Sequence, residues 1–331
     1  MKLSYLDLET TDPAVNLATE QQVFDALPRD RTYFMLWRND NAVIVGKHQN
    51  TFAEINEPYI REHGIRVVRR LSGGGAVYHD LGNLNFTFIT DAGETPQLDF
   101  RLFCLPVIRT LESFGVKAEV NGRNDITIDG KKFSGNSQYI KTGRVMHHGT
   151  ILFDSDLSVV SGALRVSESK IQSKGIKSVR SRVTNVRPFL KSDVDLAAFR
   201  AALLQNVLSE TPGEEYRLTA QDREAIERLR AERYDTYAWN YGASPKCTLL
   251  KSGRVEGCGL VEAYFTVENG YIRELAFHGD FFSLDEPEAL AKRFLGLRPE
   301  PQDFAAALEG VDVSRYFAGM ENDVFLRLLT E

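Results

Sequence analysis

Tight turns between neighbouring strands constrain the fold of this chain more than any other feature of its sequence. The dipeptides Asp129-Gly130 and Asn269-Gly270 each separate two short runs of strand-forming residues, which is the strongest local signal for a β-hairpin. Strands expected at 33–37 and 42–45 are likewise joined by a tight turn at 39–41. Because strands follow strands directly, we do not expect a doubly wound parallel sheet, whose neighbouring strands need a helix between them. The pattern instead predicts a mixed sheet of the α/β (α+β) class.

Helical patterns and one change of pattern divide the 331 residues into two expected domains. Apolar residues at helical spacing predict the main helices at 13–23, 98–114, 194–208 and 220–233. A short stretch at 239–245 that contains Gly, Pro and Ser follows the last of them, and strands and short helices come after it. We therefore expect a larger domain at residues 1–242 and a small α+β domain at residues 246–331.

Charge and cysteine content exclude several classes of protein. A formal net charge of −6 argues against a chain that coats nucleic acid or binds a membrane surface through basic residues, so we expect neither partner. No apolar run approaches the ~18 residues of a membrane-spanning helix, and the first eleven residues lack the apolar stretch of a signal peptide. Cys104, Cys247 and Cys258 are far apart and odd in number, which favours a reducing, cytoplasmic location over a disulfide framework.

A glycine-rich segment at residues 69–80 carries the strongest functional signal. Its three consecutive glycines, Gly73 to Gly75, stand between two expected strands and allow a backbone to approach a ligand closely. Arg70 and Ser72 beside them can grip a carboxylate or a phosphate. The spacing matches neither a P-loop nor a dinucleotide-binding turn, and no helix follows. A flexible glycine turn without a ligand is the alternative.

Two further strand segments carry polar groups that suit a pocket. Lys132, followed by Ser134-Gly135, can deliver a fixed positive charge, although a lysine in a solvent-facing hairpin would give the same pattern. His147 and His148 are adjacent on an expected strand and must point to opposite faces, so only one of them can line a given pocket. A buried, hydrogen-bonded histidine is the alternative for either.

A basic run stands out against the acidic average. Residues 170–191 contain seven lysines and arginines and no acid. Such a run indicates contact with a polyanion, either a nucleotide phosphate or an acidic partner, and a solvated basic loop is the alternative. Because no aromatic residues interleave with the charges, binding of single-stranded nucleic acid is poorly supported.

The order and spacing of four segments together resemble the bacterial lipoate–protein ligase family. The four segments are 70–83 (RLSGGGAVYHDLGN), 124–138 (NDITIDGKKFSGNSQ), 147–152 (HHGTIL) and 175–185 (GIKSVRSRVTN). The resemblance implies a mixed-sheet catalytic domain of the biotin/lipoate ligase type, related to class II aminoacyl-tRNA synthetases, and a small C-terminal accessory domain. It also implies a reaction in which lipoic acid and ATP with Mg²⁺ form lipoyl-AMP and pyrophosphate. The lipoyl group then passes to a lysine of an acceptor, either a lipoyl domain of a 2-oxoacid dehydrogenase E2 subunit or the glycine-cleavage H protein.

The resemblance also assigns roles to individual residues of this chain. Lys132 matches the catalytic lysine that stabilises charge at the activated carbonyl and the α-phosphate. The residues expected to bind lipoate and lipoyl-AMP are Leu17, Trp37, Arg70, Ser72, Gly73, Gly74, Gly75, Val77, His79, Asn83, Ser134, Gly135, His148, Gly149 and Thr150. The residues expected to bind the nucleotide or adenylate are Asn124, Asp125, Lys174, Gly175, Lys177, Ser178, Val179, Arg180 and Arg182, with Asp125 also expected to contact Mg²⁺.

An ATP-independent octanoyl or lipoyl transferase of the same fold is the main competing function. Such an enzyme carries the acyl group as a thioester and needs a cysteine in the pocket. Cys104 lies at an apolar position of an expected helix, where burial in the core is expected. Cys247 and Cys258 lie beyond the expected domain boundary. The remaining alternatives are a biotin–protein ligase and a non-enzymatic protein, such as a lipoyl-protein binding module or a degenerate regulator.

Overall fold

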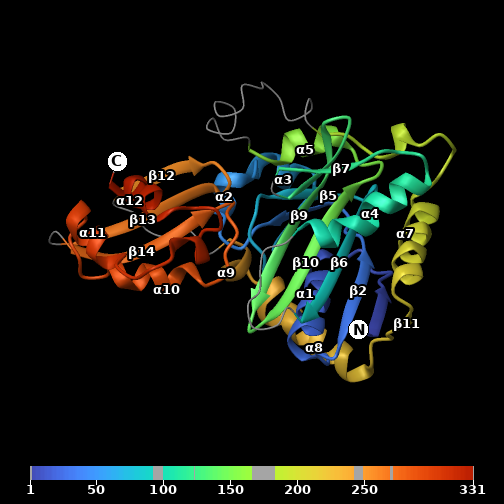
Figure 1. Ribbon diagram of the computed structural model, residues 1–331, viewed down its shortest axis with the longest axis horizontal. Coiled ribbons are helices and arrows are strands. Elements are labelled where there is room, and N and C mark those ends of the chain that lie inside the picture. Colours follow the sequence, from blue (N-terminus) through green and yellow to red (C-terminus); the bar gives the residue numbers. More distant parts are fainter. Residues whose placement is uncertain are drawn as a thin grey trace.

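The computed structural model describes residues 2–91, 100–122, 124–165, 183–241, 249–268 and 271–330. Figure 1 shows a larger body built around a broad sheet and a smaller body formed by the C-terminal strands and helices. No helix among the described residues is long and apolar enough to cross a membrane.

The larger body contains an eight-stranded mixed sheet, as the turn signals predict. The strand order is β11-β1-β2-β6-β10-β9-β8-β7. β1 pairs in parallel with β2 and β11, and the other neighbours are antiparallel. The strands are β1 (Lys2–Asp7), β2 (Arg31–Trp37), β6 (Asn83–Asp91), β7 (Glu119–Asn121), β8 (Asp125–Ile128), β9 (Lys131–Lys141), β10 (Arg144–Leu152) and β11 (Gly213–Glu215).

The expected hairpin at Asp129-Gly130 is confirmed. These two residues have φ of 49° and 74° and connect β8 to β9, which is the left-handed geometry that a two-residue turn requires. The Asn269-Gly270 turn lies outside the described residues, but β13 and β14 on either side of it are antiparallel neighbours.

The hairpin expected between 33–37 and 42–45 is wrong. β3 (Ala42–Val45) belongs to a separate three-stranded sheet with β4 (Arg66–Arg69) and β5 (Val77–His79). The turn is bound to the start of helix α1 instead of closing a hairpin. Asn16 donates from Nδ2 to the carbonyl of Arg38 at 2.8 Å and to Oδ1 of Asn39 at 3.0 Å. These bonds fix the direction in which the chain leaves β2 of the large sheet and enters β3 of the small sheet.

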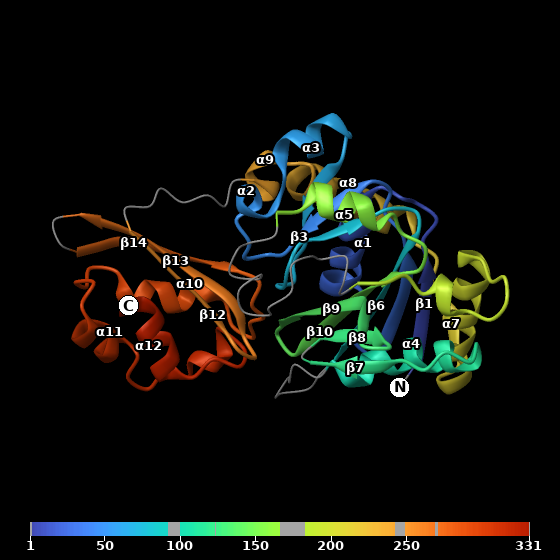
Figure 2. The same ribbon diagram turned by 90° about the horizontal axis from the view of Figure 1, so that it is seen from above.

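Helices cover both faces of the large sheet, because alternate residues of each strand point to opposite faces. On β2, Phe34 and Leu36 pack with α4 and α7, whereas Tyr33, Met35 and Trp37 pack with α1 and α8. Figures 1 and 2 show these helices in place. The helices of this body are α1 (Pro13–Ala26), α2 (Thr51–Glu54), α3 (Glu57–Glu62), α4 (Arg101–Ser113), α5 (Leu157–Ala163), α7 (Leu196–Glu210), α8 (Ala220–Leu229) and α9 (Tyr237–Asn240).

The smaller body has its own core. Its antiparallel strands β12 (Leu249–Val255), β13 (Gly259–Glu268) and β14 (Tyr271–Gly279) pack against α10 (Pro287–Ala291), α11 (Pro301–Ala307) and α12 (Asn322–Thr330). This body touches the glycine-rich segment directly, since the amide of Gly74 donates to the carbonyl of Phe281 at 3.2 Å. A Cβ on Gly73 would overlap that same carbonyl, so glycine is required for the contact.

Candidate functional site

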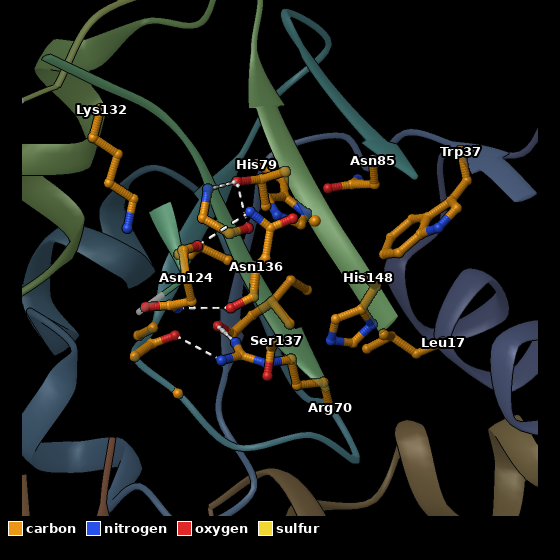
Figure 3. A pocket seen from close by; sticks show the side chains of 18 residues that line it. Leu17, Trp37, Arg70, His79, Asn85, Asn124, Lys132, Asn136, Ser137 and His148 are labelled. Carbon is orange, nitrogen blue, oxygen red and sulfur yellow. Dashed lines mark hydrogen bonds between the residues drawn. The ribbon is translucent and has the colours of Figure 1, made fainter. Parts of the chain in front are cut away.

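A cavity of about 120 Å³ brings together most of the residues that the sequence analysis selects. It lies between the large sheet and the small β3–β5 sheet, and Figure 3 shows its lining side chains. The expected residues that line this first cavity are Leu17, Trp37, Arg70, Gly74, Gly75, Val77, His79, Asn124, Lys132, Gly135, His148, Gly149 and Thr150. Residues without a prior assignment also line it: Ile44, Ala76, Asn85, Asn136 and Ser137.

Five expected residues lie behind the lining. Ser72 bonds to Arg70 and His148, and Gly73 lies against Phe281. The other three support lining residues: Asn83 donates to Asn85, Ser134 accepts from Asn136, and Asp125 pairs with Lys132. All five therefore contact residues that line the cavity, and their contact with a ligand stays a prediction.

Arg70 fixes the shape of the loop at residues 72–75, called the glycine loop from here on. Its Nη2 donates to the carbonyls of Gly73 at 2.6 Å and Gly75 at 2.9 Å, and its Nη1 donates to Ile44 at 3.2 Å. Gly74, with φ of +88°, gives the loop its sharp bend. Burial lowers the pKa of Arg70 to about 10, so the guanidinium stays charged at neutral pH. Its expected grip on a carboxylate remains a prediction, because the described bonds of this side chain lie within the protein.

The two adjacent histidines point to opposite faces, as strand geometry requires. His148 lines the first cavity, whereas His147 stacks on Phe103 in the core with ring centroids 4.8 Å apart. Burial lowers the pKa of His147 well below its usual value. His79 also lines the cavity, and burial lowers its pKa to about 3, which keeps the ring neutral at physiological pH. A neutral His79 can orient neighbouring groups but is a poor proton acceptor at that pH.

Lys132 stands where the first cavity meets a second one. The second cavity, of about 300 Å³, shares with the first the residues Ala76, Val77, Lys132, Gly135 and Thr150. The Lys132 Nζ lies 2.7 Å from Oδ1 of Asp125, and both side chains are partly exposed. Figure 3 shows Lys132 on the opposite side of the first cavity from the apolar side chains of Leu17 and Trp37. A single ammonium group therefore faces both cavities, at the end away from the apolar wall.

Gly135 provides the space for the Lys132 ammonium. A Cβ at position 135 would lie 2.9 Å from Lys132 Nζ and 3.0 Å from its Cε. We expect Gly135→Ala to displace the Lys132 ammonium and to lower the rate of the catalysed reaction by roughly 10-fold, because a misplaced catalytic group acts less effectively. The melting temperature should stay unchanged. Steady-state kinetics and thermal melting on the same preparation check this. Wild-type kinetics in the variant would contradict the proposed crowding.

The basic run and the metal contact are only partly covered by the described residues. Lys174, Gly175, Lys177, Ser178, Val179, Arg180 and Arg182 lie outside the described residues. The chain that follows them returns next to the site, because the amide of Thr184 donates to the carbonyl of Lys132 at 2.8 Å. No group of three or more His, Cys, Asp or Glu that could hold a metal ion is found in the part of the chain that the structure describes.

The geometry defines a class of protein: a mixed-sheet fold with two adjoining cavities that share one lysine. Two families match the sequence of this chain. Residues 12–208 match the lipoyl protein ligase A/B catalytic domain, and residues 244–329 match the bacterial lipoate protein ligase C-terminus. The chain belongs to the lipoate–protein ligase family.

Named relatives agree with this membership. The chain is 42% identical to "Lipoate--protein ligase 1" of Staphylococcus aureus, over 97% of both chains. It is 43% identical to "Lipoate-protein ligase LplJ" of Bacillus subtilis, over 96% of this chain and 97% of the relative. A solved "lipoate-protein ligase A bound with ATP" is 29% identical, with a TM-score of 0.63, and covers 74% of this chain and 100% of its own.

A second solved relative is described together with a lipoyl domain. The "bi-partite lipoate protein ligase and its E2 lipoyl domain" of Thermoplasma acidophilum is 30% identical, with a TM-score of 0.67, and covers 75% of this chain and 100% of its own. The Plasmodium falciparum structure "LipL1 in complex lipoate" has a TM-score of 0.78 over 99% of this chain and 98% of its own, and at 23% identity it shows the fold. The expected mixed-sheet ligase fold is confirmed.

Proposed function

We propose that this chain is an ATP-dependent lipoate–protein ligase that activates lipoate in the first cavity with a nucleotide in the second. The position of Lys132 at the shared wall carries the proposal, since the reaction joins a carboxylate to a phosphate at one point. Family membership and the relatives described as bound to lipoate or to ATP support the same substrates.

The chemistry has two steps. A lipoate carboxylate oxygen attacks the α-phosphorus of ATP, the bond to the β-phosphate oxygen breaks, and pyrophosphate leaves. The amine of an acceptor lysine then attacks the acyl carbon, AMP leaves with the bonding electrons, and the amine loses a proton. Two anions meet in the first step, so a fixed positive charge at Lys132 lowers the barrier through electrostatic stabilisation.

The remaining residues take supporting roles in this proposal. Leu17 and Trp37 surround the lipoyl tail, and the Trp37 indole already donates to Thr87 Oγ1 at 2.9 Å, which leaves its ring face for apolar contact. Gly74 and Gly75 lie along the acyl chain, with Asn124 and Thr150 nearer the nucleotide. The residues of 174–182 complete the adenylate site. An acyl-adenylate needs protection from water, which a closing loop would provide.

We include Mg²⁺ in the proposal because the site offers a carboxylate oxygen, the kind of ligand that this ion prefers. Asp125 is a carboxylate beside the second cavity's lysine, and Mg²⁺ prefers oxygen ligands from one or two carboxylates together with substrate phosphates. Asp125 would hold the ion, which supplies further charge neutralisation at the phosphates.

The acceptor, location and domain division complete the proposal. The acceptor is a lipoyl domain of an E2 subunit, supported by the E2 partner of the Thermoplasma relative, or a glycine-cleavage H protein with an equivalent lysine. Cys104 and Cys258 are buried in the separate cores of the two bodies, so they are not bonded to each other, which fits a cytoplasmic location. Residues 1–242 form the catalytic domain and 246–331 the accessory domain, supported by the separate C-terminal core and the two matched ranges.

The competing transferase needs a cysteine nucleophile in the pocket. Cys104 lies on α4 and is fully buried against apolar residues of the large sheet. Cys258 is fully buried in the core of the smaller body. Neither lines the first cavity. The described residues therefore favour the ligase.

Lipoate-dependent ATP–pyrophosphate exchange tests the function directly. We expect purified protein with ATP, Mg²⁺ and lipoate to exchange labelled pyrophosphate into ATP without any acceptor, because adenylation is reversible and precedes transfer. Octanoate measured in parallel gives the chain specificity, and omission of the acid gives the background. Exchange at background level would contradict the ligase, since a thioester transferase does not use ATP.

A further inference from the structure

A buried carboxylate lies beside the first cavity, and neither the sequence motifs nor the proposed reaction assigns it a role. Glu20 lies on α1 and is 1% exposed. Glutamate is almost never fully buried unless it is paired, because the charge loses its hydration. Its partners therefore indicate what the carboxylate does.

Glu20 begins a line of hydrogen bonds that ends in the glycine loop. Its two oxygens lie 3.1 and 3.2 Å from Nδ1 of His148. The other nitrogen of that ring, Nε2, lies 2.6 Å from Oγ of Ser72, and Nε of Arg70 donates to the same Oγ at 3.0 Å. All four side chains are buried, with His148 the most exposed at 7%.

With a neutral imidazole, the chemistry of the two ends gives each bond a direction. A carboxylate accepts, so the imidazole proton lies on Nδ1, facing Glu20. Nε2 of His148 then accepts from the hydroxyl of Ser72, and the Ser72 oxygen accepts from the Arg70 guanidinium, which only donates. A buried anion and a buried cation are thus connected through two neutral groups.

A further contact ties Glu20 to the apolar wall. The hydroxyl of Thr87 donates to Glu20 Oε1 at 2.5 Å, and Thr87 itself accepts from the indole of Trp37 at 2.9 Å. One carboxylate therefore contacts, through single intermediates, both Trp37 in the cavity wall and the Ser72–Arg70 pair that shapes the loop. Figure 3 shows His148 beside Leu17, on the side of the cavity away from Lys132.

We propose that Glu20 is a positioning residue for the acyl chain, which acts by fixing the proton on His148 and, through Ser72 and Arg70, the shape of the glycine loop. The inference rests on the proposed role of the first cavity as the acyl site. Among the described contacts, Glu20 touches neither the second cavity nor Lys132. The proposed role of Glu20 is therefore in lipoate binding and not in the chemical step.

Kinetics of Glu20→Gln test the inference first. Glutamine lacks the negative charge that holds the imidazole proton on Nδ1. With its amide nitrogen turned to Nδ1, the proton moves to Nε2, where it opposes the Ser72 hydroxyl. We expect the KM for lipoate in pyrophosphate exchange to rise by about 10- to 100-fold, the usual range for a lost hydrogen bond to a charged group. The KM for ATP and kcat at saturating lipoate should stay within about 3-fold of wild type, as expected when uniform binding alone is lost.

Two matched variants separate this effect from general damage. Glu20→Asp keeps the negative charge and should recover most of the lipoate KM. Asp25→Asn makes the same carboxylate-to-amide change at an exposed position of the same helix, and its KM should equal that of wild type. An unchanged lipoate KM in folded Glu20→Gln would overturn the inference. A rise in the lipoate KM of Glu20→Asp or Asp25→Asn as large as that of Glu20→Gln would also overturn it.

Nitrogen-15 NMR of the histidine rings gives a readout that a purely structural role would not move. His148 should carry its proton on Nδ1 in the wild type and on Nε2 in Glu20→Gln. The same tautomer in both proteins would overturn the inference. This measurement needs no activity, so absence of exchange in the wild type would refute the proposed function without deciding the role of Glu20.

Ser72→Ala covers the case in which Glu20→Gln does not fold. Removal of the hydroxyl breaks the same line of bonds at its other end, so the lipoate KM should rise by a similar factor while the ATP KM stays unchanged. Where both variants fold, the double variant should show less than the product of the two single effects, because the groups act as one unit. Independent effects would overturn the proposed connection.

Discussion

Replacement of Lys132 by alanine is expected to slow lipoate-dependent pyrophosphate exchange by about 10²–10³-fold, the usual cost of removing one charge-stabilising group. Lys132 is the cation at the wall shared by both cavities, and its ammonium is held 2.7 Å from Asp125. Without it, the negative charge that develops at the α-phosphate and the carbonyl loses a fixed partner. Initial rates at saturating lipoate and ATP measure the loss, and thermal melting confirms that the variant folds.

Lys131→Ala is the matched control for this result. Lys131 is exposed, neighbours Lys132 on β9, and points to the opposite face of the strand, so its removal should leave exchange unchanged. With chemically supplied lipoyl-AMP, we expect Lys174→Ala and Arg180→Ala to retain more transfer activity than Lys132→Ala. Equal rates in Lys132→Ala and Lys131→Ala would refute the catalytic role.

Replacement of Gly149 by alanine is expected to destabilise the catalytic domain by roughly 1–3 kcal/mol, the cost of overpacking a core. A Cβ at this position would overlap Oδ1 of Asn136 and lie 2.5 Å from the ring of Phe86, which is fully buried. Neither group is the free end of a flexible chain, so the strand itself must move. For a domain of this size, each kcal/mol lowers the melting temperature by about 2–4 °C, which calorimetry measures.

Gly75→Ala provides the comparison for stability. Gly75 also lines the first cavity, but no atom lies within 4 Å of a Cβ placed there, and its φ is not positive. We expect its melting temperature to match that of the wild type. A Gly149→Ala protein as stable as Gly75→Ala would show that the space around Phe86 is not filled as described.

Local sequence predicts the elements of this fold better than their partners. Asp12 caps α1 as its position before Pro13 predicts, with its side chain accepting from the amides of Ala14 and Val15. Asp129-Gly130 makes the expected hairpin because two residues suffice to set its geometry. The turn at 39–41 carries similar residues and yet joins two sheets, since bonds to Asn16, more than twenty positions away, decide its direction.

The same limit applies to the site. Short sequence motifs identify the triple glycine, Lys132 and His148 as candidate site residues. Glu20, in contrast, is one acidic residue on a helix with no local signal. Its partners lie 67 and 128 positions away in the sequence. The alternating pattern of β6 could have identified Asn85 and Thr87 as candidate site residues, because they alternate with apolar residues and so share one face with Asn83.

The bond between Gly74 and Phe281 makes the smaller body part of the wall behind the proposed acyl site. Thermodynamic reciprocity then applies: if docking of this body strengthens lipoate binding by some factor, lipoate must strengthen docking by the same factor. The glycine loop would thus couple occupancy of the first cavity to the smaller body, with the Gly74 amide as one of the contacts between the two bodies. Any acceptor that contacts both bodies would encounter a surface whose stability depends on what the enzyme already holds.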